Sequence, residues 1–261
     1  MDMSDTADLI FTPPFGYDEI GPLHRTDRVR LPQGATPEFC RRLNAIALSA
    51  GEFFAASRDY PIVFASADGL RGFAPVIVLG LADGQNLFVD AAGRWDDAAY
   101  LPAFIRRYPF CISRVITHGQ ERAERVICVA KSHLDPQGAA LYDESGTATP
   151  QWGSYEKLLA EFEKDLDYTA TMCESLAALG LFSSFRFQIK QGEATSLTLE
   201  GMYRIDEARL AALPAEQIKS LVADGLMGRV YAHIQSLANF TRLYGRAIAR
   251  LNPAPLESGG R

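Results

Sequence analysis

Aromatic and arginine side chains are concentrated between residues 95 and 108 of this chain. The side chains concerned are Trp95, Tyr100, Arg106, Arg107 and Tyr108. A guanidinium binds planar carboxylates and phosphates through paired hydrogen bonds, and aromatic rings supply flat apolar walls. We therefore predict that these residues line a pocket for an anionic or sugar-like ligand. The alternative is a structural corner, in which the rings fill the core and the arginines pair with carboxylates or backbone carbonyls.

His233 is a further candidate for the ligand-binding set. Counted at about 100° per residue, it lies on the apolar stripe of a predicted C-terminal helix. A half-buried imidazole needs a hydrogen-bond partner for at least one ring nitrogen. Two interpretations stay open, a ligand-binding histidine and a core histidine held by a hydrogen bond.

A metal site is the second chemical hypothesis. His133 and Asp135 form an HxD motif, and His233 and Arg242 lie downstream, as in the two-histidine, one-carboxylate triad of non-haem iron oxygenases. The motif is short enough to arise by chance, Asp135 precedes a proline in a predicted turn, and His233 belongs to a predicted helix. We therefore predict no metal site and keep these residues as the alternative. The cofactor stays unknown.

Nucleophilic catalysis has little support in the sequence. There is no GxSxG elbow, and the four cysteines are far apart, with none in a CxxC motif. Cys40, Cys111, Cys128 and Cys173 are predicted to be reduced thiols in the core. No catalytic residue can be assigned.

Composition narrows the function further. The 261 residues carry a formal net charge of −6, which disfavours a phosphate-neutralising surface and hence a nucleic-acid partner. No window approaches the roughly 18–20 apolar residues that span a bilayer. The acidic N-terminal segment has no apolar signal region, so we expect a cytoplasmic protein.

The first half of the chain is typical of antiparallel β structure with short helices. Asp83-Gly84 separates two strand-like runs, Val76–Leu81 and Asn86–Asp90, and predicts a hairpin. Ser49 and Glu52 have capping-box spacing before a short helix. Further strands are predicted at 60–65, 110–116 and 125–130, with a polar connection at 117–124 and a short aromatic helix ending in Arg106-Arg107-Tyr108-Pro109-Phe110.

A different periodicity begins near residue 150. Apolar residues recur at spacings of three and four from Tyr155 to Leu179, which predicts a long helix ended by Gly180. A hairpin near 182–200 and two short helices follow. The last predicted helix runs from about Leu226 to Leu251, with Gly228 and Gly245 as weak points.

These elements predict a single α+β domain over residues 1–261. A β-rich part at about 20–150 supplies an antiparallel twisted sheet, which packs against long C-terminal helices in a helix-rich part at about 151–251.

Several motifs occur in a recognisable order. They are Tyr60-Pro-Ile-Val-Phe64, Gly80-Leu-x-x-Gly-x-Asn-Leu-Phe-Val-Asp90, Gly93-x-Trp95, Tyr100-x-Pro102-Ala-Phe-Ile-Arg-Arg-Tyr-Pro-Phe110 and Leu199-Glu-Gly-Met-Tyr-x-Ile-Asp206. This order resembles the bacterial SapC-like family over roughly residues 20–245. The family is biochemically uncharacterised, so the resemblance implies no reaction and no catalytic residues. Its name comes from a surface-layer-associated protein, and many members are encoded near genes for outer-membrane nutrient uptake.

Three functions are therefore compatible with the sequence. The first is an accessory or small-ligand-binding protein linked to nutrient uptake, with a small molecule as its ligand. The second is a metal-dependent oxygenase, and the third is a surface-layer or structural component. A protein partner or a homo-oligomer is left open.

Overall fold

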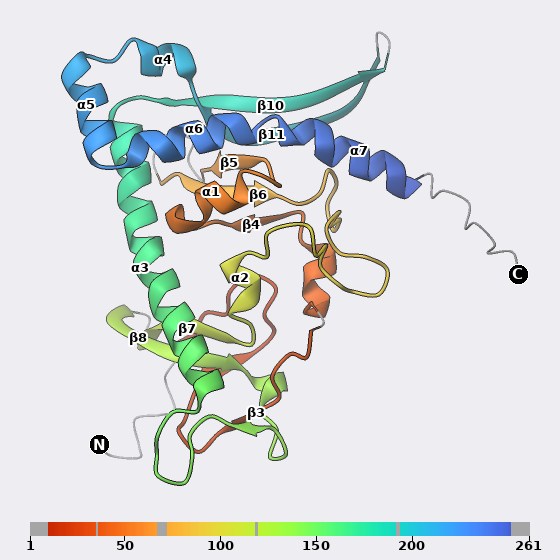
Figure 1. The fold of residues 1–261 in the computed structure, drawn as a ribbon, viewed down its shortest axis with the longest axis vertical. Coiled ribbons are helices and arrows are strands. Elements are labelled where there is room, and N and C mark those ends of the chain that lie inside the picture. Colours follow the sequence, from red (N-terminus) through yellow and green to blue (C-terminus); the bar gives the residue numbers. More distant parts are fainter. Residues whose placement is uncertain (1–9, 35, 67–71, 118–119, 192–193, 252–261) are drawn as a thin grey trace, which may run out of the picture. The chain divides into compact units, whose positions relative to one another are not determined.

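The computed structural model describes residues 10–34, 36–66, 72–117, 120–191 and 194–251 (Figure 1). The fold is α+β, and every strand pair in these segments is antiparallel. Two compact units can be distinguished, and each combines segments that are distant in sequence. Unit 1 comprises Met1–Cys40, Ala91–Arg94 and Ala103–Lys164, and unit 2 comprises Arg41–Asp90, Trp95–Pro102 and Asp165–Arg261.

Unit 1 is built on a four-stranded sheet. Its strand order is β1 (Ile10–Phe11), β7 (Phe110–Thr117), β8 (Gln120–Ala130) and β2 (Ile20–Pro22). The predicted strands at 110–116 and 125–130 are confirmed, but β8 begins earlier than expected. Part of the predicted polar connection therefore belongs to the β7–β8 hairpin. A two-stranded sheet of β3 (Arg28–Val29) and β9 (Ala139–Ala140), the short helix α2 (Ala103–Arg106) and a 3-10 turn (Lys131–His133) complete the unit.

The core of unit 1 forms where β7 and β8 meet the first turns of α3 (Pro150–Ala178). Its buried residues are Val29, Phe110, Val129, Leu141, Trp152 and Leu159. Trp152 contacts the Phe110 ring edge-on at 4.9 Å between ring centroids. Burying these large side chains is the main force that holds the unit together.

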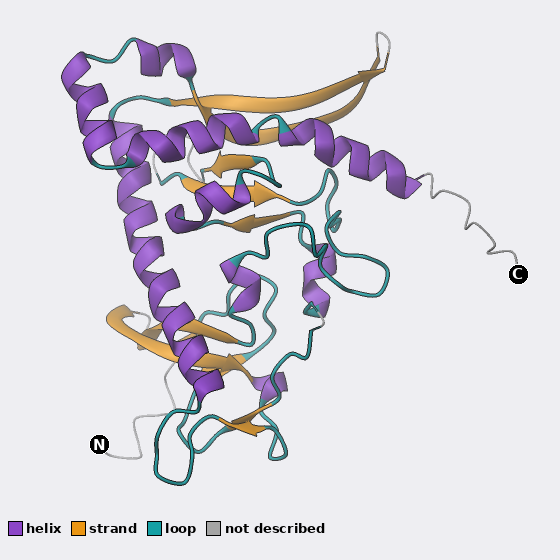
Figure 2. Cartoon of the chain, viewed as in Figure 1, coloured by secondary structure: helices purple, strands orange, loops and turns teal. Residues whose placement is uncertain are grey.

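Unit 2 is built on a five-stranded sheet and its helices (Figure 2). The strand order is β10 (Phe182–Gln191), β11 (Ala194–Ile205), β5 (Ile62–Ala65), β6 (Ala74–Val78) and β4 (Ala45–Ala47). The helices are α1 (Phe53–Ala56), α4 (Glu207–Ala211), α5 (Ala215–Ala223), α6 (Leu226–Ser236) and α7 (Asn239–Leu251). Helix α6 lies against β5 and β11.

Local signals explain most of the helix ends. The predicted capping box of Ser49 and Glu52 is present before α1. Asp206 accepts hydrogen bonds from two backbone amides of α4. The long helix α3 is confirmed, and Gly180, with φ of +67°, follows its end. Helix α3 begins in unit 1 and ends in unit 2.

Two predictions about local structure are wrong. Asn86–Asp90 forms turns and a single bridge from Val89 to Trp95, not the second strand of a hairpin. The Asn86 side chain accepts the Phe88 amide, which closes a local turn in place of a strand. Strand β6 instead pairs with β4 and β5.

The second wrong prediction is the single C-terminal helix. The structure has two helices there, because α6 ends at Ser236 and α7 begins at Asn239. The break lies at neither predicted glycine. The Ser236 hydroxyl donates to the His233 carbonyl, and the side chain of Asn239 donates to the carbonyls of Ser57 and Tyr60. Side-chain bonds of this kind compete with continuous helical bonding.

Candidate functional site

Trp95, the first residue of the predicted pocket, is part of the core of unit 2. Its side chain is buried, and its indole Nε1 donates to the Tyr60 hydroxyl at 3.0 Å. Tyr60 is fully buried and donates in turn to the Tyr100 carbonyl. Burial raises the pKa of the Tyr60 phenol above its ordinary value, so the hydroxyl stays protonated. The indole is therefore held by a buried hydrogen-bond chain.

Tyr100 connects the same segment to the capping box. Its hydroxyl donates to Oε1 of the buried Glu52 at 3.0 Å. The other carboxylate oxygen of Glu52 accepts from the Ser49 amide and hydroxyl, at 3.1 and 2.9 Å. The Tyr100 amide donates to Asp59 at 2.9 Å. These bonds tie the aromatic stretch to the start of α1.

Arginines of α7 hold the loop that precedes Tyr100. Arg246 lies over the Phe88 ring, 4.3 Å from its centroid, and pairs with Asp96 at 2.7 Å. Arg250 donates to the Asn86 carbonyl at 2.6 Å and to the Val89 carbonyl. We call residues 80–90 and 95–100 the unit 2 loop block. Its polar groups bind the protein's own backbone and side chains.

The remaining residues of the predicted pocket belong to unit 1. Arg107 is 5% exposed, and its guanidinium carbon lies 5.0 Å from the Phe104 centroid and 4.6 Å from that of Phe162. Tyr108 is half-buried and contacts the His133 ring edge-on at 4.8 Å. Arg106 is exposed at the end of α2. The five aromatic and arginine residues are thus divided between the two units.

His233 is a core histidine of unit 2. Its Nδ1 donates to the Ile62 carbonyl at 2.8 Å, and its Nε2 accepts the Ile205 amide at 3.1 Å. Loss of hydration in the core, with a smaller contribution from Arg204, lowers its pKa to about 4, against the raising effect of the hydrogen bond to Ile62. The neutral ring therefore joins β5 to β11, and both of its nitrogens are engaged.

The alternative metal residues are also divided. His133 and Asp135 belong to unit 1, whereas His233 belongs to unit 2. The Asp135 carboxylate accepts the Gln137 amide at 2.8 Å, and Nδ1 of His133 bonds the Arg30 carbonyl. Within the described segments, no group of three His, Cys, Asp or Glu residues is placed to hold a metal ion.

All four cysteines are free and buried, as predicted. Burial raises the pKa of Cys40, Cys128 and Cys173 to about 12 and that of Cys111 to about 11. Thiols with such pKa values carry almost no thiolate near neutral pH, so they are poor nucleophiles.

A concave site that the sequence did not indicate lies beside β2 in unit 1. This β2 cavity has a volume of about 510 Å³, within the usual range for small-ligand sites. Its lining residues are Ile10, Phe11, Pro13, Asp18, Glu19, Ile20, Gly21, Pro22 and Lys131. The Lys131 ammonium pairs with the Glu19 carboxylate. The lining therefore combines apolar residues with acidic and basic side chains.

Tyr17 fixes one wall of the β2 cavity. Its ring contacts Tyr108 edge-on at 5.0 Å, and its hydroxyl donates to the Phe110 carbonyl at 3.0 Å. Burial raises the pKa of this phenol, which keeps the donor protonated. Gly16 has φ of +85°, and a Cβ there would lie 2.4 Å from the Phe39 ring. Only glycine fits this turn.

Strand β8 positions Lys131, another residue of the lining. Lys131 directly follows β8, and its amide donates to the Glu19 carbonyl at 2.8 Å. The β8 residue Val129 pairs with Phe110. The Tyr108–Phe110 segment therefore contacts both Tyr17 and β8, which flank the lining residues in the sequence.

Comparison with known proteins identifies the family. The sequence model of the SapC family matches residues 23–243. The chain belongs to the SapC family. No curated protein and no solved structure matches it. The SapC match includes the unit 2 loop block, the Tyr108–Phe110 segment and Lys131, whereas the cavity wall at 10–22 precedes it.

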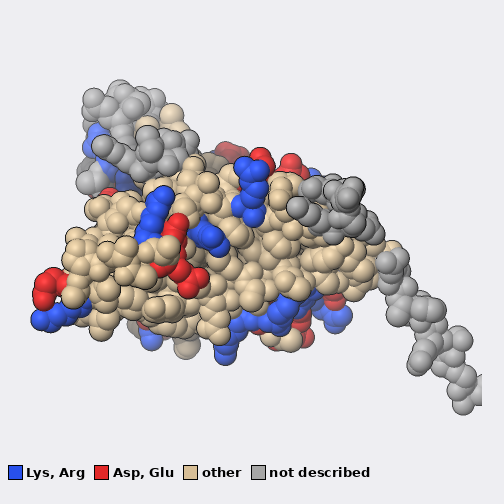
Figure 3. Space-filling view, turned by 90° about the horizontal axis from the view of Figure 1, so that it is seen from above, with Lys and Arg blue, Asp and Glu red and all other residues tan. Residues whose placement is uncertain are grey.

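Helix composition and surface charge complete the description of this SapC-family chain. None of the helices in the described segments has the length and apolar composition needed to cross a membrane. On the face seen in Figure 3, basic and acidic side chains are interspersed, with wide areas of neither between them. That face has no extended surface of one charge.

Unit 2 has a hollow of its own, of about 440 Å³. Small residues of α3 and Phe73 form most of its lining, with the Glu174 carboxylate and the buried Cys173 thiol. Among the described residues of this lining, Glu174 is the one with a carboxyl or basic side chain, so the hollow offers less recognition chemistry than the β2 cavity.

Proposed function

We propose that this SapC-family chain is an accessory binding protein, whose β2 cavity takes a small zwitterionic ligand with an apolar side chain. The observation that carries the proposal is the composition of the cavity wall. Lys131, paired with Glu19, shares the lining with Asp18, while Phe11 and Ile20 contribute apolar surface. A free amino acid has the matching groups, since its carboxylate suits the ammonium and its own ammonium suits the carboxylates.

The Lys131–Glu19 pair is well suited to exchange. Its side chains are 48% and 75% exposed, and an ion pair this accessible contributes little stability. A ligand carboxylate can therefore replace Glu19 as the partner of Lys131 at small cost. Glu19 and Asp18 are then free to receive the ligand's ammonium group.

The other candidate side chains are held within the fold or are poor nucleophiles, which favours a binding role over a catalytic one. Trp95, Tyr100 and His233 are held in hydrogen bonds inside unit 2, and the cysteine thiols have raised pKa values. A protein that captures an amino-acid-sized solute without converting it suits an accessory role in nutrient uptake.

Isothermal titration calorimetry with three related compounds tests the proposal. Phenylalanine carries both charges, phenethylamine carries only the ammonium, and 3-phenylpropanoate carries only the carboxylate. We expect phenylalanine to bind at least about tenfold more tightly than either analogue, because each charged contact contributes independently. Lys131→Met should weaken phenylalanine binding by about tenfold or more.

Lys157→Met is the matched control. Lys157 is also an exposed lysine of unit 1 paired with a glutamate, Glu161, but it is not part of the cavity lining. This variant should bind phenylalanine as the natural chain does. Absence of phenylalanine binding, or equal loss in both lysine variants, would contradict the proposal.

A further inference from the structure

The outer edge of strand β10 is a surface suited to strand pairing. β10 is the terminal strand of the unit 2 sheet, and β11 is its only hydrogen-bonded neighbour among the described strands. An unpaired edge exposes a row of backbone N–H and C=O groups to any complementary strand. At Phe182–Gln191 this edge is long compared with the three- to five-residue strands β4, β5 and β6 of the same sheet.

Strand β10 is also regular. Along Ser184–Ile189, exposed and half-buried positions alternate without interruption. The two irregularities of the hairpin place their extra residues in β11. Between the pairs Phe185–Met202 and Phe187–Leu199, β11 has Glu200 and Gly201 opposite the single residue Arg186, and its second extra residue is at 196. Bulges usually protect an edge from pairing, and β10 has none.

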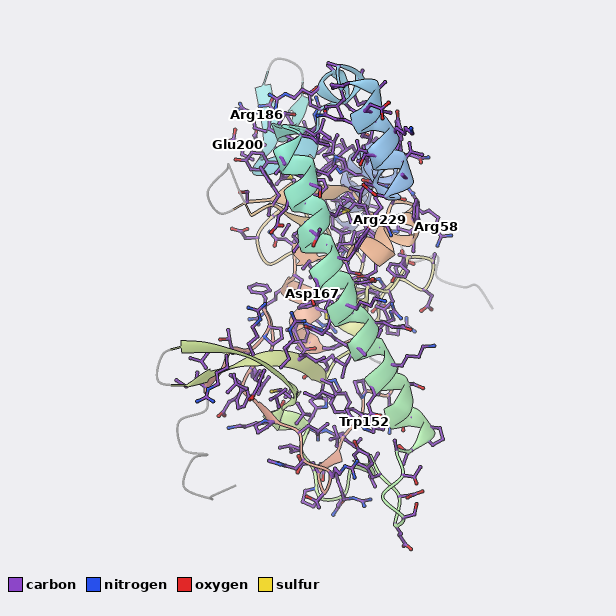
Figure 4. The ribbon with its side chains drawn as sticks, turned by 90° about the vertical axis from the view of Figure 1, so that its left-hand side faces the viewer. Arg58, Trp152, Asp167, Arg186, Glu200 and Arg229 are labelled. Carbon is purple, nitrogen blue, oxygen red and sulfur yellow. The ribbon has the colours of Figure 1, made fainter. Side chains whose placement is uncertain are left out.

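The outward face of the hairpin is nearly neutral. Arg186 of β10 pairs with Glu200 of β11 at 3.6 Å, and Figure 4 shows the two side chains beside each other. Within Ser184–Ile189 the other exposed residues, Ser184 and Gln188, are uncharged. In this stretch a second copy of the strand therefore meets one cation, Arg186, which already has a carboxylate partner.

We propose that two copies of this chain form a two-fold dimer by antiparallel pairing of β10 with β10. Such symmetry requires one residue of β10 to face its own copy. Centring the pair on Phe187 places Phe185 opposite Ile189 and Arg186 opposite Gln188. Both half-buried apolar positions then gain a cross-strand neighbour, which stabilises paired strands.

Other registers are less favourable. Centring on Arg186 places two arginines opposite each other, and centring on Gln188 places Arg186 opposite Lys190. Like charges in directly opposed positions destabilise a strand pair. Centring on Phe185 avoids this clash but moves part of the pairing beyond the start of the strand. The Phe187 register alone combines long overlap with compatible charges.

This register identifies a residue that tests it. Gln188→Arg creates two symmetry-related Arg–Arg contacts, and we expect it to weaken the dimer by about tenfold. Gln188→Glu places a carboxylate opposite each Arg186 and should strengthen the dimer several-fold. Sedimentation equilibrium over a concentration series measures both changes. The natural chain should show a reversible monomer–dimer equilibrium, because a single strand pair is a small interface.

Thr198 provides the matched control. It pairs with Gln188 inside the hairpin and is exposed on the same face, but it lies on β11 and not on the outer edge. Thr198→Arg should leave the dissociation constant unchanged, and circular dichroism confirms that each variant is folded. A chain that stays monomeric, one that forms open-ended assemblies, or a dimer insensitive to both Gln188 substitutions would overturn the proposal.

Discussion

The two units each contain one tryptophan, and the two indoles are bonded in the same way but in different surroundings. Trp95 in unit 2 and Trp152 in unit 1 both donate from Nε1 to a tyrosine hydroxyl at 3.0 Å. In unit 2 that tyrosine, Tyr60, is fully buried and donates to a backbone carbonyl. In unit 1 it is the half-buried Tyr142, which donates to the Glu156 carboxylate at 3.3 Å.

The difference shows how the same residue types serve two purposes. In unit 2 the chain of hydrogen bonds ends inside the fold, so it holds the loop block in place and presents nothing to a ligand. In unit 1 the chain ends at a titratable side chain near the surface. Unit 1 also contains the β2 cavity, whose charged groups are exposed. On the proposed function, the ligand site therefore belongs to unit 1, whereas the hydrogen-bonded loop block of unit 2 serves the fold.

Acid sensitivity should separate the units most strongly. His233 is the one histidine in the sequence of unit 2 and is neutral when folded, with a pKa of about 4 against about 6.5 when unfolded. Protonation thus favours the unfolded state. Its contribution is complete above about pH 6.5 and is lost as the pH falls towards 4, a change of about 3 kcal/mol in the free energy of unfolding.

Urea unfolding of the natural chain and of His233→Gln at several pH values measures this change. A glutamine amide can donate to the Ile62 carbonyl and accept the Ile205 amide, but it does not titrate. The variant should therefore lack this part of the pH dependence. An identical pH dependence in both proteins would show that His233 does not control the acid response.

Tyr60→Phe should produce the next largest effect. The substitution keeps the ring and removes two buried hydrogen bonds, one from Trp95 and one to the Tyr100 carbonyl. We expect the free energy of unfolding to fall by about 2–3 kcal/mol. Thermal unfolding followed by circular dichroism is sufficient to detect a loss of this size.

Tyr142→Phe is the equivalent substitution in unit 1 and should cost about 1 kcal/mol or less. The bonds that it removes are partly exposed, and water can replace them. The same thermal unfolding experiment provides the comparison. If Tyr142→Phe is as costly as Tyr60→Phe, the proposed contrast between the two units is wrong.

Asp96→Asn should have the smallest effect. The Arg246 guanidinium lowers the pKa of the Asp96 carboxyl, although both side chains are about one-third exposed. The pair therefore stabilises the fold above the ordinary carboxyl pKa and loses this contribution as the pH falls through the lowered value. We expect a loss of about 0.5–1 kcal/mol at neutral pH, reduced by high salt, in urea unfolding.

The sequence predicted those features that depend on neighbouring residues. The capping box at Ser49, the long helix before Gly180 and the strand from Phe110 all follow from local spacing. The hairpin at 76–90 failed because α7, far along the chain, supplies the arginines that bind the loop. Periodicity over a few residues contains no information about such distant partners.

The site was harder to predict for the same reason. The spacing of Trp95, Arg107 and His233 indicated chemistry, but their partners are backbone groups and rings that only folding brings together. The β2 cavity joins Lys131 to a wall more than a hundred residues earlier. The proline and glycine residues between positions 13 and 22 indicate irregular structure there, but they do not indicate a ligand.

Hydrogen–deuterium exchange with and without saturating phenylalanine tests most directly whether unit 1 contains the ligand site. We expect slower exchange in peptides covering residues 10–22 and Lys131, because the ligand would contact these residues of the β2 cavity. Exchange in the unit 2 loop block, residues 80–90 and 95–100, should not change. Protection of the loop block without protection at 10–22 would contradict a ligand site in unit 1. It would instead favour a site at the Trp95–Tyr100 stretch.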